Sequence, residues 1–149
     1  MEAAQQRVGV SEARELRASL RKIRSVLHAD TAVVLTLDPT GRVLEPFDMS
    51  GLNRNRRAWV RVPVGQGFAG KVAASAAPVV LDNVTATNVY NPILRESGVR
   101  SLAGVPLVNE GTLIGVLHVG SFTPRRFDDG DLATLIELSE EVVEHIRHT

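Results

Sequence analysis

Apolar residues recur every three or four positions in the first part of the chain. They are Ala13, Leu16, Leu20, Ile23 and Leu27. This spacing predicts a helix with a narrow apolar seam on one face. Ser11 is suited to cap that helix, and Glu12 and Glu15 lie in its first turn, where negative charge is favourable. Such a seam packs either on a partner helix or on the chain's own sheet, and the pattern leaves both alternatives open.

Three strands are predicted after this helix. Residues Thr31–Leu37 are rich in β-branched side chains, a turn follows at residues 38–41, and Arg42–Phe47 returns as the second strand. A polar loop over residues 49–57 leads into the third strand, where apolar and polar positions alternate. The alternation predicts a buried face of Ala58, Val60 and Val62 and a solvent-facing basic face of Arg57, Trp59 and Arg61. The alternative role for these arginines is contact with an anionic ligand.

Glycine and proline divide the middle of the chain. Pro63, Gly65 and Gly67 predict a sharp turn before a short helix over residues 68–76. A short strand is expected over residues 78–83, followed by an irregular segment over residues 84–98 that contains one helical turn at 93–96. A loop of this length in a compact domain usually has a function.

The last third predicts two more strands and a helix. The strands cover residues 99–108 and 112–120, with a three-residue hairpin turn between them. Asp128 is placed to cap a final helix over residues 129–147, with Asp131 in its first turn. Consecutive hairpins indicate an α+β fold with a mainly antiparallel sheet. We expect the N- and C-terminal helices on one face, the short helix and the loops on the other, and space for a small molecule beneath those loops.

Composition narrows the functional classes. The 149 residues suit one domain, which we place at residues 11–149 after a flexible lead-in at 1–10. Acidic and basic residues number 17 each, so charge gives no case for nucleic acid or membrane partners. No apolar run approaches the about 18 residues that span a bilayer, and we expect a cytoplasmic protein. The chain has no cysteine, which excludes disulfides and thiolate chemistry.

Five short segments in this order resemble a GAF domain, and together they cover nearly everything from Ser11 to the C-terminus. They are residues 65–70 (GQGFAG), 78–82 (PVVLD), 98–107 (GVRSLAGVPL), 115–119 (GVLHV) and 127–131 (FDDGD). The resemblance implies a GAF- or PAS-like antiparallel sheet of five or six strands between helix layers. It also implies a sensory or dimerising module of a bacterial signalling protein. The fold alone does not name a ligand.

The subtypes of the family differ in residues that can be checked. Bilin-binding members and the free methionine sulfoxide reductases work through cysteines, which are absent here. Haem-binding relatives use a histidine in the loop that corresponds to residues 84–98, and this loop has none. Cyclic-nucleotide-binding members carry Asn-Lys where this chain has Ser121-Phe122, and a glutamate where it has Leu132. We therefore expect no cofactor and have weaker grounds for a cyclic nucleotide.

Candidate site residues follow from the expected space between sheet and loops. We expect a small-molecule ligand to contact Trp59, Phe68, Leu81, Asp82, Asn83, Tyr90, Ile93, Arg100, Ser101 and His118. His118 has a structural alternative as a satisfied core residue. No catalytic constellation is present, so we expect no enzyme activity. His145 and His148 are three residues apart near the C-terminus, and we interpret them as a chance pair instead of a metal site.

The terminal helices are the expected output of the domain. We predict a homodimer interface at Leu16, Leu20, Ile23, Leu27, Leu135, Val142 and Ile146. In this interpretation a bound ligand shifts the arrangement of the terminal helices and so signals to an output domain in a larger chain or pathway. The alternative function is a dimerisation or regulatory module that binds no ligand.

Overall fold

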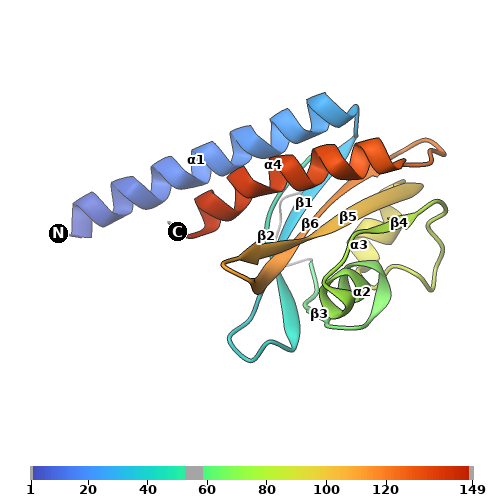
Figure 1. Ribbon diagram of the computed structural model, residues 1–149, viewed down its shortest axis with the longest axis horizontal. Coiled ribbons are helices and arrows are strands. Elements are labelled where there is room, and N and C mark those ends of the chain that lie inside the picture. Colours follow the sequence, from blue (N-terminus) through green and yellow to red (C-terminus); the bar gives the residue numbers. More distant parts are fainter. Residues whose placement is uncertain (1, 53–58, 148–149) are drawn as a thin grey trace.

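The computed structural model describes residues 2–52 and 59–147, and for residues 2–10 it describes the backbone alone. Within these residues, four helices and six strands follow one another (Figure 1). The helices are α1 (Glu2–Leu27), α2 (Gly67–Ser75), α3 (Pro92–Glu96) and α4 (Asp129–Arg147). The strands are β1 (Thr31–Leu37), β2 (Val43–Ser50), β3 (Val62–Pro63), β4 (Val79–Leu81), β5 (Ser101–Asn109) and β6 (Thr112–Ser121).

The six strands form one antiparallel sheet in the order β3-β2-β1-β6-β5-β4. The predicted α+β class and the antiparallel sheet are therefore confirmed. The turn between β5 and β6 is one residue shorter than predicted, because Asn109 pairs with Thr112. Its two residues, Glu110 and Gly111, both have positive φ angles, of 50° and 79°. Such a turn matches the twist of the strands that it joins.

The sheet separates two apolar cores. Helices α1 and α4 lie side by side on one face, and α2, α3 and their connections cover the other (Figure 1). Alternation along β1 serves both cores, since Val34 contacts the α1/α4 side and Val33 and Leu35 contact the α2/α3 side. In β6, Leu117 belongs to the first core and Val116 to the second. Only the backbone of the sheet therefore separates the two cores.

Helix α1 differs from its prediction at its start. It begins at Glu2 and not at Ser11, and the flexibility expected of residues 1–10 stays a prediction. The predicted seam lies inside the chain's own core, where the exposed fractions of Leu16, Leu20, Ile23 and Leu27 are between 0% and 4%. Of the two packing alternatives, the structure shows the second, because α1 packs on the chain's own sheet and on α4.

The prediction of a longer strand before Pro63 is wrong. The structure limits β3 to Val62 and Pro63, and the expected alternation is reversed at residues 59 and 60, whereas Arg61 is exposed and Val62 buried as predicted. Trp59 is buried, with 6% of its surface exposed, whereas Val60 is 38% exposed. Arg57 and Ala58, the first residues of the predicted strand, lie outside the described residues. Strand β2 also runs three residues further than predicted, to Ser50, so that Met49 is a core residue.

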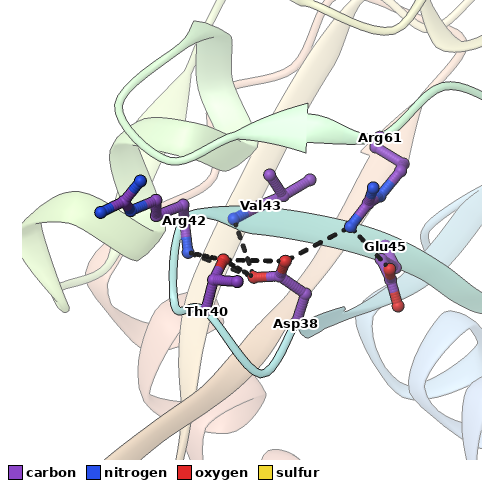
Figure 2. Close-up of polar contacts among 6 residues, drawn as sticks. All are labelled: Asp38, Thr40, Arg42, Val43, Glu45 and Arg61. Atoms are coloured by element: carbon purple, nitrogen blue, oxygen red, sulfur yellow. Dashed lines mark hydrogen bonds and ion pairs between the residues drawn. The ribbon is translucent and has the colours of Figure 1, made fainter.

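Arg61 does not belong to a strand, and its side chain takes part in a polar cluster (Figure 2). The guanidinium of Arg61 lies 3.3 Å from Asp38 Oδ2 and 2.9 Å from Glu45 Oε1. Asp38 also accepts hydrogen bonds from the Thr40 hydroxyl and from the backbone N–H groups of Arg42 and Val43. Burial raises the pKa of Asp38, but these hydrogen bonds and the Arg61 charge outweigh it and leave the pKa below its ordinary value. Arg61 therefore has a structural role at the β1–β2 turn.

Helix α4 has the predicted bounds and cap. The Asp128 carboxylate accepts from the Asp131 N–H at 2.8 Å, and Asp131 accepts from the Asp128 N–H at 3.0 Å. This reciprocal pair satisfies two donors at the helix N-terminus. Among the described residues, no helix combines the length and the apolar character that a membrane span requires.

Candidate functional site

A small cavity lies between the sheet and the layer formed by α2 and α3. Strands β1 and β6 form its floor, and α2 and the segment before α3 form its roof. The space open to the centre of a water molecule is about 10 Å³, which is about enough for one water. The residues that line it are Leu35, Trp59, Val62, Phe68, Ala69, Val89, Tyr90, Asn91, Leu94 and His118.

His118 is the titratable group of this lining that is most deeply buried. It lies in the middle of β6, with 1% of its surface exposed, and the Phe68 ring meets its imidazole edge-on at 5.8 Å between centroids. Its Nδ1 is buried, and no described residue hydrogen-bonds to it. Burial lowers the pKa of His118 to about 4, because a charged imidazole loses its hydration there. The ring is therefore neutral near pH 7.

Asn91 brings a second polar group to the cavity. Its side-chain Oδ1 accepts a hydrogen bond of 3.0 Å from the Ile93 N–H and so caps α3. The capping bond fixes the amide, and the Nδ2 group is buried without a hydrogen-bond partner among the residues that the structure describes. An amide NH₂ only donates. Asn91 therefore offers the cavity a donor that calls for an acceptor.

The N-terminal turn of α2 forms part of the roof. Gly67 begins the helix with φ of 62°, and a side chain at this position would meet the backbone nitrogen of Tyr90 at 2.7 Å. Gln66 supplies no side-chain cap within the described structure, and the first turn holds no acidic residue. The first N–H groups of a helix have no acceptor inside the helix and carry the positive end of its dipole. Phe68 and Ala69 of this turn line the cavity.

Four of the predicted ligand-binding residues line the cavity: Trp59, Phe68, Tyr90 and His118. Tyr90 forms the outer wall, because 43% of its surface is exposed. Leu81 and Ile93 pack against the same core, but they lie outside the cavity lining. The structure thus brings together the aromatic and histidine candidates, which are far apart in the sequence.

The predicted polar candidates lie elsewhere. Asp82 and Asn83 are exposed, and the nearest cation to the Asp82 carboxylate is Arg126 at 3.9 Å. Arg100 lines an open surface groove beside α3. Ser101 is fully buried, but its hydroxyl is used within the chain, since it donates to the Asp82 carbonyl and accepts from the Arg125 N–H. The structure does not join these four residues to the cavity.

Sequence reasoning missed Asn91 as a site residue. Asparagine directly before proline is a signal for a helix start, and a side chain with one end fixed as a cap has its other end directed by the fold. That the free end reaches the cavity lined by His118, 27 positions later, depends on tertiary packing.

The acid stability of the protein tests the burial of His118. Its pKa rises from about 4 in the folded chain to about 6.5 on unfolding, so the unfolded state binds the extra proton first. The neutral ring contributes to the free energy of unfolding above pH 6.5. This contribution, about 3 kcal/mol in total, is lost as the pH falls towards 4. We expect urea unfolding at pH 7 and pH 4.5 to show this loss, and His118→Gln to lack that component. Equal pH dependence in both proteins would contradict the burial of a neutral imidazole.

Comparison with known proteins gives a family match and many structures of the same fold. The GAF domain family matches residues 12–146. The GAF domain of a phosphoenolpyruvate-protein phosphotransferase from Coxiella burnetii has a TM-score of 0.77 at 18% identity, over 97% of this chain and 93% of that one. The free methionine-R-sulfoxide reductase of Neisseria meningitidis has a TM-score of 0.73 at 22% identity, over 97% and 86% of the two chains.

A third similar structure is the NreA protein of Staphylococcus aureus, mutated in its nitrate binding site. Its TM-score is 0.68 at 22% identity, over 80% of this chain and 92% of that one. No curated protein sequence matches the chain. At these identities the structural matches show the fold.

Proposed function

The chain belongs to the GAF domain family, a family of sensory and regulatory modules, and on that premise we propose that it senses a small polar molecule. The ligand binds in the cavity under α2 and Asn91, on the floor formed by His118. Its presence is relayed to the terminal helices and from there to an output domain. This is the role expected from the sequence, and the cavity supports a specific location for the ligand.

One observation carries the proposal. Two residues that line the cavity, His118 and Asn91, each have a buried side-chain nitrogen, Nδ1 and Nδ2, to which the described residues give no hydrogen-bond partner. A buried donor or acceptor without a partner costs about 1–3 kcal/mol. Native proteins rarely retain such groups without a use for them. A bound molecule with an acceptor for Asn91 and a polar atom for His118 would remove both costs.

The donors and the size of the cavity favour a small, acceptor-rich molecule such as an oxyanion. The Asn91 amide and the N-terminal turn of α2 both supply hydrogen-bond donors, and none of the described lining residues is acidic. The cavity has room for about one water, so the ligand has few heavy atoms and Tyr90 must move outward to admit it. The nitrate binding site of NreA, on the same fold, supports a ligand of this size.

Strand β6 supplies the relay. His118 contacts the cavity, while its neighbours Leu117 and Val119 pack in the core beneath α1 and α4. A ligand that moves the His118 side chain or shifts β6 therefore changes the packing under both terminal helices. The ligand shifts the population between two arrangements by as much as it prefers one of them.

An Asn91→Asp variant tests the ligand site. Aspartate keeps the capping oxygen for Ile93 but removes the buried NH₂ donor, so we expect affinity for an oxyanion to fall by at least about 10-fold. Nitrate, nitrite, formate, acetate and bicarbonate serve as probes, measured by calorimetry and by the rise in melting temperature.

Asn88→Asp is the matched control. Asn88 lies in the same segment, and its amide hydrogen-bonds to Thr85 and Asn83 away from the cavity lining. This variant is expected to bind as the wild type does. A wild-type protein that binds none of the probes would overturn the oxyanion proposal. Equal losses in both variants would show that the ligand lies elsewhere.

A dimerisation module without a ligand is the second candidate. The small volume of the cavity favours it, as do the exposed apolar side chains of Val26 on α1 and Ile136 on α4. The predicted interface residues other than Ile146 are buried in the chain's own core, so a homodimer through these helices needs their exposed residues. Absence of binding to every probe, together with a dimer in solution, would favour this candidate.

We also propose that the domain is not an enzyme. Among the described residues, the cavity lining holds no nucleophile beside a base, and His118 is buried and neutral. The sulfoxide reductases of this fold work through cysteines, as the family resemblance implies, and this chain has no cysteine. The expected outcome is that methionine sulfoxide is not reduced by the purified protein.

A further inference from the structure

A cluster of three metal-ligating side chains joins the terminal helices away from the cavity. Glu12 and Glu15 lie one turn apart on α1, and His145 lies in the last turn of α4. The imidazole Nδ1 is 3.0 Å from Glu12 Oε2 and 3.5 Å from Glu15 Oε2. One donor atom from each residue lies within 4.8 Å of the other two. The side chains of His145 and Glu12 are 13% and 19% exposed, so the cluster is partly withdrawn from water.

The Nε2 side of the imidazole also faces a carboxylate. His145 Nε2 lies 3.7 Å from Glu141 Oε1, one helical turn earlier on α4. That carboxylate is itself fixed, because Ser19 Oγ donates to Oε1 at 2.9 Å and Lys22 Nζ lies 3.5 Å from Oε2. A histidine that ligates a metal through one nitrogen usually donates its other N–H to a carboxylate, which sets its tautomer and orientation. Glu141 is the carboxylate on that side of the ring.

We propose that Glu12, Glu15 and His145 bind a divalent transition-metal ion of the Zn²⁺ class, with Glu141 as the positioning residue. Zinc bonds of about 2.0–2.2 Å to imidazole and carboxylate separate tetrahedral ligand atoms by about 3.3–3.5 Å. The two distances from Nδ1 are close to this separation. Glu15 is 54% exposed, so its carboxylate can turn to complete the set and leave a fourth position for water.

Charge distinguishes a metal site from a simple ion pair. The cluster contains three carboxylates, one ammonium group and a neutral imidazole when the metal is bound, which gives −3 + 1 = −2. One protonated histidine needs a single carboxylate, whereas this histidine has three around it. A dication balances this excess and uses the imidazole as a ligand. The bound ion would link the first described side chains of α1 to the end of α4, which is the helix pair proposed to carry the signal.

Metal binding by the tag-free protein tests the proposal. We expect calorimetric titration with ZnCl₂ to give one site per chain, and CoCl₂ to give a visible absorption spectrum of a low-coordinate ion. His145→Gln and Glu12→Gln should each weaken Zn²⁺ binding by at least about 10-fold, and Glu141→Gln by about 10- to 100-fold. Zn²⁺ should raise the melting temperature of the wild type more than that of these variants.

Two controls exclude other sites. Glu137→Gln removes an exposed carboxylate of α4, and His148→Gln removes the neighbouring histidine outside the described residues; both should bind Zn²⁺ as the wild type does. The proposal is overturned if the wild type binds Zn²⁺ no more tightly than His145→Gln. It is also overturned if His148→Gln abolishes binding while Glu12→Gln does not. In the first case the cluster is an ion pair only.

Discussion

Replacing Leu20 with alanine is expected to lower the free energy of unfolding by about 2–5 kcal/mol. Leu20 is completely buried in the core that α1 and α4 form with the sheet. The substitution removes three carbon atoms from a site whose neighbours are parts of regular elements and relax only in part. Because a domain of this size is stable by about 5–15 kcal/mol, a large share of its stability would be lost. Urea unfolding followed by circular dichroism measures the change.

Val26→Ala is the matched control on the same helix. Val26 is 49% exposed, so its truncation should change the free energy of unfolding by about 0.5 kcal/mol or less. A seam that served as a dimer interface would behave differently. In that case Leu20→Ala would change the elution volume in size-exclusion chromatography and leave the stability of the monomer nearly unaltered.

Replacing Gly67 with alanine is expected to destabilise the protein by about 2–5 kcal/mol and to abolish ligand binding. The left-handed backbone costs an alanine about 1–2 kcal/mol. The new methyl group would also lie 2.7 Å from Tyr90 N, and the backbone there cannot rotate away as a side chain can. Forcing the contact costs about 1–3 kcal/mol more and pushes α2 away from the segment that carries Asn91.

Gly65→Ala separates the two contributions. Gly65 also has a positive φ, of 94°, but no described heavy atom lies within 4 Å of the position that its Cβ would take. This variant should lose only the backbone term of about 1–2 kcal/mol and keep its ligand affinity. Equal destabilisation of the two variants would mean that α2 does not press on Tyr90 in solution.

The parts of the fold that the sequence predicted well depend on neighbouring residues. Asp128 and Asp131 fix the start of α4 by a local cap, and the bounds of β1 follow from its β-branched run and the turn after it. The family resemblance is confirmed by the family match, and each of its segments is a short run of consecutive residues that the sequence shows directly.

The parts that failed depend on residues far apart in the chain. Trp59 is buried and Val60 exposed where a strict alternation predicts the reverse, and the neighbouring Arg61 pairs with Asp38 and Glu45, which lie far from it in the sequence. The spacing of the α1 seam left two packing alternatives open, and it is the tertiary structure that packs this seam on α4 and the sheet.

The site shows the same limit. His118 was found because a histidine in an apolar strand is conspicuous, and Tyr90 because it is an aromatic residue of the irregular segment expected above the site. Asn91 was missed because its amide matters only through the cavity that it reaches. The pairing of Glu12 with His145, 133 positions apart, follows from the packing of α1 on α4 and has no local sequence signal.

The proposed ligand site is tested most directly by nitrogen-15 NMR of the labelled protein during titration with the small oxyanions, nitrate first. We predict that the side-chain NH₂ signals of Asn91 and the imidazole nitrogen signals of His118 shift together and saturate at one binding constant, while the side-chain NH₂ signals of Asn88 stay in place. Signals of Asn91 and His118 that do not move with any of the probes would contradict a ligand in this cavity.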